Sequence, residues 1–82
     1  MTKTILIVED ESDLAGVLAY NADREGFSAI PVKNGAEALK ILMDGPLPDI
    51  VLLDLMLPDI SGIDVCRQMR AMDQTRCIPV LM

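Results

Sequence analysis

Three acidic residues directly follow two short apolar runs. The run Ile5–Val8 is followed by Glu9 and Asp10, and the run Ile50–Leu53 is followed by Asp54. Short runs of β-branched residues and leucine are typical of strands that are buried on both faces of a parallel sheet. Binding sites in such sheets form beyond the carboxyl ends of the strands, where the strand order reverses. If these two strands are neighbours, we expect the three carboxylates to converge on one shallow cleft.

A cluster of this kind calls for a cation. Two unit charges about 4 Å apart repel each other by about 4 kcal/mol at an effective dielectric constant near 20, and the acids would raise each other's pKa unless a cation joined them. The chain has no histidine, and a ligand set made only of oxygen atoms favours a hard ion such as Mg²⁺. A carboxylate beside Mg²⁺ can attack a phosphoryl group, so Asp54 is a candidate phosphorylation site. The alternative is that all three are solvated loop acids, which is the favoured interpretation of any one acid alone.

The elements that must position these acids alternate between strand and helix. Apolar residues recur at helical spacing in three segments, at Leu14, Val17 and Leu18, at Leu39, Leu42 and Met43, and at Val65, Met69 and Met72. The expected elements are a strand at Ile5–Val8, a helix at Ser12–Glu25, a strand at Phe27–Val32, a helix between Asn34 and Gly45, a strand at Ile50–Leu53, a helix that follows Ser61, and a strand at Cys77–Met82.

Local signals mark the ends of these elements. Asn34 with Glu37, and Ser61 with Asp64, have the spacing of helix-capping pairs, and Gly26 is a helix stop. Pro31 cannot donate to a sheet, so its strand is expected at an edge. The β-α alternation predicts an α/β fold, a parallel sheet with helices on both faces and right-handed crossovers.

Composition limits the class of protein. The chain has 82 residues, enough for one small domain, and its 51% hydrophobic and 2% aromatic content predicts an aliphatic core. A net charge of −6 argues against direct nucleic acid binding by this segment. Cys66 and Cys77 lack a metal-type spacing and are expected to be reduced thiols, with a disulfide as the lesser alternative. No signal peptide or membrane span is visible, which predicts a soluble cytoplasmic protein.

The combined pattern of "ILIVEDE", "DIVLLDLMLPDISGID" and "IPVLM" resembles the receiver domain of two-component response regulators, along the whole chain. Its most specific part is the spacing of Asp54, Pro58 and Gly62, in which the last two residues would shape the loop after the acid. The segments "DLMLPD" and "QTRCIPVLM" are similar to those of OmpR/PhoB-type transcriptional regulators. The resemblance implies a flavodoxin-like (CheY-like) doubly wound parallel sheet with strand order 2-1-3-4.

The resemblance also implies a role for each site residue. Asp54 would accept phosphate from the phosphohistidine of a histidine kinase. Asp10 would ligate Mg²⁺ together with Asp54 and the backbone carbonyl of Met56, and Glu9 would hold a metal-bound water. The module would then control a transcriptional output domain outside this chain.

The sequence departs from the family pattern after Met82. Family receivers continue with a Ser or Thr, a helix, a fifth strand that ends in lysine, and a last helix. The expectation is therefore that residues 1–82 form the N-terminal portion of a receiver domain, with an unpaired fourth strand and an exposed apolar patch. Such a chain is expected to self-associate, swap strands or be marginally stable.

Three other functions remain open. A hydrolase that works through an aspartyl phosphate usually has a second acid two residues after the nucleophile, and Met56 stands there. A structural half-domain, engineered or a pseudo-receiver, would associate with proteins without being phosphorylated. A flavin or nucleotide site is disfavoured because no glycine-rich loop follows the first strand.

Overall fold

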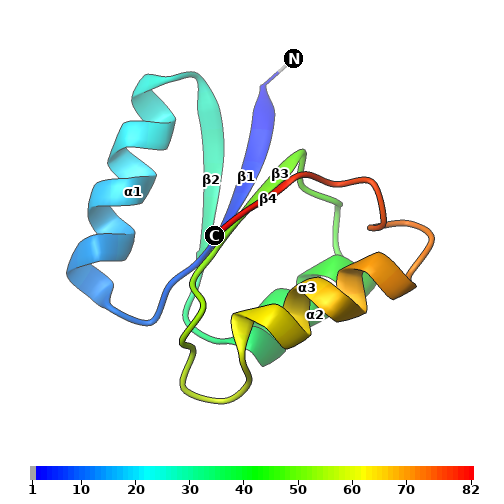
Figure 1. Ribbon diagram of the computed structural model, residues 1–82. Coiled ribbons are helices and arrows are strands. Elements are labelled where there is room, and N and C mark those ends of the chain that lie inside the picture. Colours follow the sequence, from blue (N-terminus) through cyan, green and yellow to red (C-terminus); the bar gives the residue numbers. More distant parts are fainter. Residues whose placement is uncertain (1) are drawn as a thin grey trace.

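The computed structural model describes residues 2–82 as a parallel sheet with helices on both faces (Figure 1). The sheet order is β2-β1-β3-β4, and α1 lies on one face while α2 and α3 lie on the other. This confirms the predicted flavodoxin-like fold and the edge position of the strand that contains Pro31. The elements are β1 (Lys3–Val8), α1 (Ser12–Arg24), β2 (Phe27–Val32), α2 (Gly35–Asp44), β3 (Ile50–Leu53), α3 (Gly62–Ala71) and β4 (Val80–Leu81).

The register of the sheet brings the ends of three strands level with one another. Val8 of β1 pairs with Val32 of β2 on one side and with Leu53 of β3 on the other. Hydrogen bonds continue one residue further, because the amide of Glu9 donates to the Val32 carbonyl at 3.0 Å and the amide of Asp54 donates to the Val8 carbonyl at 3.1 Å. The residues that follow β1 and β3 therefore leave the sheet at the same edge.

The helix caps follow the sequence signals in part. The side chain of Asn34 accepts from the Glu37 amide at 2.9 Å, and the Ser61 hydroxyl accepts from the Ile63 amide at 3.0 Å. The start of α1 was not predicted in this form, because the carboxylate of Glu11 serves as its N-cap. The helix ends before Gly26, whose φ of 90° is accessible to glycine at little cost.

The core lies between the sheet and the α2–α3 face. Ala38, Leu42, Val65 and Met69 are fully buried against the strands, together with Leu6, Val8, Val51 and Leu53. Met43, which the helical spacing included in the apolar stripe of this helix, does not belong to the core, because it is 60% exposed and Ala38 is buried instead. At about 100° per residue, Leu42 lies about 40° around the helix from Ala38, whereas Met43 lies about 100° beyond Leu42, at the side of the buried stripe.

The apolar face of α1 is not buried. None of its residues reaches full burial, and Leu14 and Val17 are 43% and 56% exposed. The helical spacing predicted the helix correctly, but the described chain places no second helix beside α1 on this face of the sheet (Figure 1). The expected exposed apolar patch is therefore present.

The last strand is shorter than predicted. Only Val80–Leu81 pairs with β3, and residues 72–78 form turns. The Arg70 guanidinium donates to the carbonyls of Arg76 and Ile78 at 2.8 and 3.0 Å, which holds the segment before β4 in a bent path. Similarly, α3 ends at Ala71, so Met72 is an extended cap residue and not part of the helical stripe.

Both cysteines, Cys66 and Cys77, are free thiols, as expected. Cys66 is half-buried beside the core, and Cys77 is exposed. Within residues 2–82, no helix has both the length and the apolar composition that a bilayer crossing requires.

Candidate functional site

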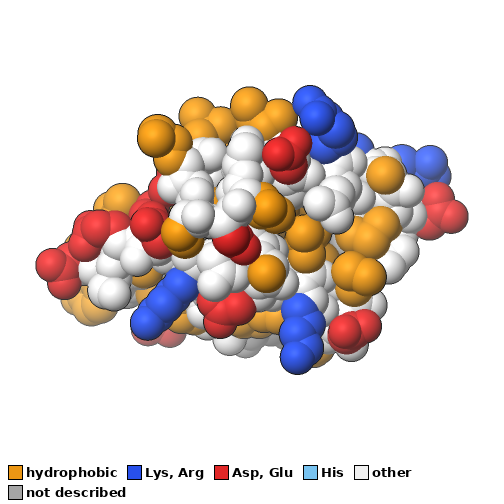
Figure 2. Space-filling model, turned by 90° about the horizontal axis from the view of Figure 1, so that it is seen from below, with side chains coloured by type: hydrophobic (Ala, Val, Ile, Leu, Met, Phe, Trp, Pro, Cys, Tyr) orange, Lys and Arg blue, Asp and Glu red, His pale blue; other side chains and the backbone are white. Residues whose placement is uncertain are grey.

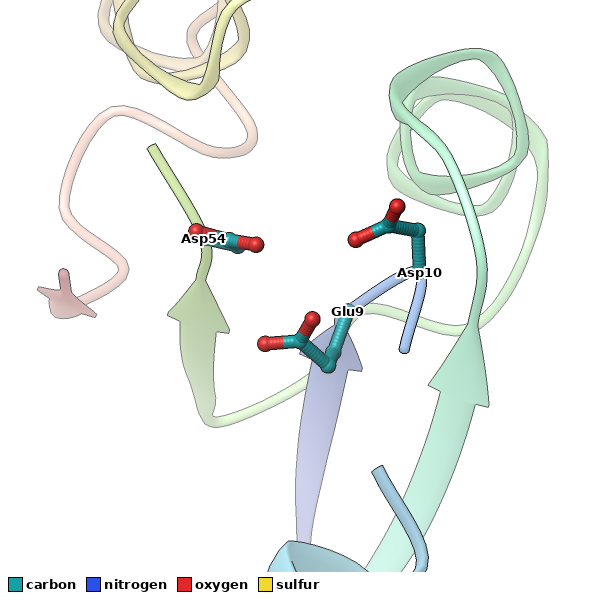
Figure 3. A group of neighbouring side chains, drawn as sticks. All are labelled: Glu9, Asp10 and Asp54. Carbon is teal, nitrogen blue, oxygen red and sulfur yellow. The ribbon is translucent and has the colours of Figure 1, made fainter. Parts of the chain in front are cut away.

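The three predicted acids meet at the carboxyl edge of the sheet. Glu9, Asp10 and Asp54 each offer a carboxylate oxygen, and these oxygens all lie within 4.8 Å of one another. Figure 3 shows Asp10 and Asp54 pointing toward each other from the ends of β1 and β3, with Glu9 between them. The sequence prediction that these strand ends are neighbours is confirmed, and the acids gather because the strand order reverses at β1 and β3.

The three acids differ in their exposure. Glu9 is buried, with 8% of its surface exposed, whereas Asp54 is half-buried and Asp10 is exposed. Burial raises the pKa of Glu9, and the nearby charges of Asp54 and Asp10 raise it further, while a hydrogen bond from the Glu11 amide opposes the shift. The cluster therefore holds negative charge at a cost to the fold.

A magnesium ion fits this donor set. The cluster supplies only carboxylate oxygens, which suit a hard divalent cation, and no His or Cys is among its members. A cation would also offset the mutual repulsion that contributes to the raised pKa of Glu9. Figure 2 looks onto this end of the molecule and shows acidic side chains across the middle of the face, with hydrophobic atoms between them.

The loop that follows Asp54 turns back on itself and closes tightly. The Asp54 carboxylate accepts from the Met56 amide at 3.2 Å, and the Gly62 amide donates to the Leu55 carbonyl at 2.9 Å. A β-carbon on Gly62 would overlap the backbone carbonyl oxygen of Asp54, so only glycine fits there. The predicted loop role of Gly62 is explained by this close approach, whereas the metal-ligand role of the Met56 carbonyl remains a prediction.

The sequence pattern indicated no role for Asp59, which lies in the same loop. Its two carboxylate oxygens accept from the amides of Gly35 and Ala36, both at 2.9 Å, at the start of α2. These hydrogen bonds, with that of Gly35 foremost, lower the pKa of Asp59. No local sequence signal could have found the contact, because it joins residues that are more than 20 positions apart.

An apolar groove borders the site. It has a volume of about 220 Å³ and runs between α1 and the sheet, lined by Leu14, Leu18, Leu52 and Met82 among others, with Glu9 and Asp54 at its edge. Because the groove reaches the acidic cluster, whatever covers it would also contact the site.

Known proteins match the chain along its whole length. The family profile of the response regulator receiver domain matches residues 5–82. The alkaline phosphatase synthesis transcriptional regulatory protein PhoP of Bacillus subtilis is 43% identical over 82 residues, which is 100% of this chain and 33% of PhoP. The sensory transduction protein RegX3 of Mycobacterium tuberculosis is 51% identical over 79 residues, 96% of this chain and 33% of RegX3. The chain thus spans about a third of the length of these relatives.

A solved structure shares the fold and part of the sequence. It is the receiver domain of sensor histidine kinase PA1611 from Pseudomonas aeruginosa, described with a magnesium ion coordinated in its active site cleft. The identity is 26% and the TM-score 0.91, over 98% of this chain and 65% of that one. One of the relatives named above, PhoP, is a transcriptional regulatory protein. Because the profile match, the identity to these relatives and the strand order agree, the chain belongs to the response regulator receiver domain family.

Proposed function

We propose that this chain is a phosphoacceptor module in two-component signalling, in which a histidine kinase phosphorylates Asp54. The observation that carries the proposal is the meeting of three carboxylates within 4.8 Å at the reversal of strand order, with Asp54 at the end of β3. Membership of the receiver family supports the same role. The hydrolase alternative is weaker, because Met56 stands where such enzymes carry a second acid.

The reaction is a phosphoryl transfer to a carboxylate. An Asp54 oxygen attacks the phosphorus of a phosphohistidine, a P–O bond forms as the P–N bond breaks, and the histidine leaves with a proton. The Met56 amide donates to one Asp54 oxygen and so fixes the orientation of the carboxylate. Half-burial leaves Asp54 accessible from the rim of the sheet.

The acids around Asp54 are proposed to bind magnesium. Asp10, Asp54 and the Met56 carbonyl would be direct ligands, and Glu9 would act through a metal-bound water. The magnesium ion described in the Pseudomonas aeruginosa receiver domain supports this assignment. When bound, the ion supplies positive charge that offsets the carboxylates and the phosphoryl oxygens.

The test compares Asp54→Asn with the wild-type chain. In NMR spectra, Mg²⁺ followed by beryllofluoride should shift the amides around Asp10 and Asp54 of the wild-type chain, and Asp54→Asn should abolish the beryllofluoride response. Asp73→Asn is the matched control, because the Asp73 side chain is 94% exposed and pairs with Arg76 in the turn that follows α3. A wild-type spectrum that ignores Mg²⁺ would instead favour a structural module that is not phosphorylated.

The proposed partners follow from the relatives. A histidine kinase would supply the phosphoryl group, and a transcriptional output domain would read it, as the description of PhoP suggests. The module would act in the cytoplasm, where such regulators meet DNA. With a net charge of −6, we expect no direct contact with nucleic acid by this segment.

The chain is also proposed to self-associate. The edge strand β4 has one paired side within the described chain, Leu81 and Met82 are more than half exposed, and the apolar face of α1 is open beside them. A second copy could pair with this edge and cover the face. Size-exclusion chromatography with light scattering should show a concentration-dependent dimer, and a well-folded monomer at all concentrations would refute the proposal.

A further inference from the structure

The loop between β3 and α3 is held at both of its ends. At its start, the Asp54 amide donates to the Val8 carbonyl of β1, and at its end the Gly62 amide donates to the Leu55 carbonyl. Between these points lies the Met56 carbonyl, which is proposed above as a metal ligand. The Met56 amide also donates to the Asp54 carboxylate, so the position of this carbonyl depends on these bonds and on what fixes the middle of the loop.

The middle of the loop is fixed by α2. The first turn of a helix has amides without partners inside the helix. In α2, the Glu37 amide donates to the side chain of the N-cap residue Asn34. The Gly35 and Ala36 amides instead donate to the carboxylate of Asp59, both at 2.9 Å. A carboxylate at the N-terminus of a helix is also favoured by the helix dipole.

The start of α2, which holds Asp59, is itself closely packed. A β-carbon on Gly35 would clash with the side chain of Ile60, the residue after Asp59, so this loop side chain packs directly against the start of the helix. One and two turns further along α2, Ala38 and Leu42 are fully buried in the core. A movement of the loop would therefore have to break both carboxylate hydrogen bonds or displace a core helix.

We propose that Asp59 is a positioning residue, which holds the loop carrying the Met56 carbonyl in place for metal binding and phosphorylation at Asp54. The inference rests on the proposed function of the acidic cluster. It assigns Asp59 no contact with the metal or the phosphoryl group, because its oxygens are occupied by the helix amides. Its effect would pass through the backbone of Leu57 and Pro58, the two residues that separate Asp59 from Met56.

The test measures Mg²⁺ affinity in Asp59→Ala and Asp59→Asn by NMR titration, alongside unfolding in urea. The loss of both hydrogen bonds in Asp59→Ala should weaken Mg²⁺ binding about tenfold, at the lower end of the effect of residues that orient metal ligands. Asp59→Asn keeps one acceptor oxygen and should give a smaller loss. Amide exchange should speed up across residues 55–61 in both variants. Asp73→Ala removes an equal charge from an exposed site and should change neither quantity.

The possible results separate the two proposals. If the wild-type chain binds Mg²⁺ and both Asp59 variants bind it equally well while losing stability, Asp59 has a structural role only and the inference is wrong. If Asp59→Ala does not fold, the titration of Asp59→Asn decides in the same way. If the wild-type chain itself gives no Mg²⁺ response, the proposed function fails first and the inference falls with it.

Discussion

At the scale of single residues, the site depends on an acid that the fold does not favour. Glu9 is buried at the end of the central strand, and burial together with the charges of Asp54 and Asp10 raises its pKa. One hydrogen bond, from the Glu11 amide, opposes this shift, and it does not cancel the effect of burial. Residues kept at the expense of stability are typical of functional sites.

Replacing Glu9 should therefore stabilise the metal-free protein. In Glu9→Gln, the amide oxygen can still accept from the Glu11 amide, but the buried charge is gone, so we expect a melting temperature a few degrees higher at pH 7. The same variant should gain less stability from Mg²⁺ than the wild-type chain does. Thermal unfolding with and without Mg²⁺ measures both effects, and a lower melting temperature without Mg²⁺ would contradict this expectation.

Two glycines in helices should respond to alanine in opposite ways. In Gly62→Ala, the new β-carbon meets the backbone of Asp54, which cannot rotate away, and we expect a loss of about 1–3 kcal/mol in the free energy of unfolding. A β-carbon on Gly16, inside α1, would meet no atom within 4 Å. Gly16→Ala should therefore gain about 0.5–1 kcal/mol through its higher helix propensity. Urea unfolding of the pair checks the sign of each change, and equal effects would refute the steric explanation.

At the scale of elements, α3 and the segment after it determine where the last strand begins. The two hydrogen bonds from Arg70 to the Arg76 and Ile78 carbonyls fix the turn that leads into β4. The hydroxyl of Thr75 is fully buried and donates to the Met69 carbonyl near the end of α3. The start of β4 at Val80 thus follows from side chains on the preceding helix and turn.

Removal of this tether should loosen β4 locally. Arg70→Ala leaves two carbonyls without their donor, so we expect a loss of about 1 kcal/mol and faster amide exchange at Val80 and Leu81. Arg67→Ala is the matched control on the same helix, because Arg67 forms only an exposed ion pair with Asp64, worth about 0–0.5 kcal/mol. Equal exchange rates at β4 in the two variants would show that Arg70 does not hold the strand.

At the scale of the whole molecule, one face of the sheet is well packed and the other is open. The core lies on the side of α2 and α3, whereas α1 leaves Val17 and Tyr20 more than half exposed. The acidic cluster sits at the border between these two halves, beside the groove that Leu14 and Met82 help to line. Any partner that covers the open face would thus lie next to Asp54, which links association to the site.

The stability of the whole chain should depend on pH in two opposite ways. The pKa of Glu9 is raised from 4.5, so its ionisation destabilises the fold progressively as the pH rises through 4.5 and above. The pKa of Asp59 is lowered from 3.8, so its contribution is present above 3.8 and is lost as the pH falls below that value. We therefore expect the metal-free chain to be more stable near pH 4–5 than at pH 7.

Urea unfolding across this pH range tests the curve. In Glu9→Gln, the loss of stability between pH 4–5 and pH 7 should be smaller than in the wild-type chain. In Asp59→Asn, the loss of stability as the pH falls below 3.8 should be smaller. A saturating concentration of Mg²⁺ should raise stability most at neutral pH, where the carboxylates are ionised; at ten times the dissociation constant the gain is about 1.4 kcal/mol. A stability that rises steadily from pH 4 to pH 7 without Mg²⁺ would contradict this account.

The sequence alone determined the order of elements, the parallel sheet and the acids of the site. Apolar runs and helical spacing are local signals, and the position of an acid directly after a buried run places it at a strand end wherever that strand lies. For the same reason Pro31 identified an edge strand, because the missing amide is a property of the residue itself. The receiver resemblance then supplied the strand order, and the observed order β2-β1-β3-β4 confirmed it.

Only the tertiary structure decided the contacts that join distant segments. The bonds of Asp59 to the start of α2, the fit of Gly62 against Asp54, the burial of Ala38 in place of Met43 and the exposure of α1 all depend on which elements lie against one another. An acid after a turn or an apolar residue on a helix has the same local pattern whether or not another segment reaches it. Packing partners are set by the whole chain, and local spacing carries no record of them.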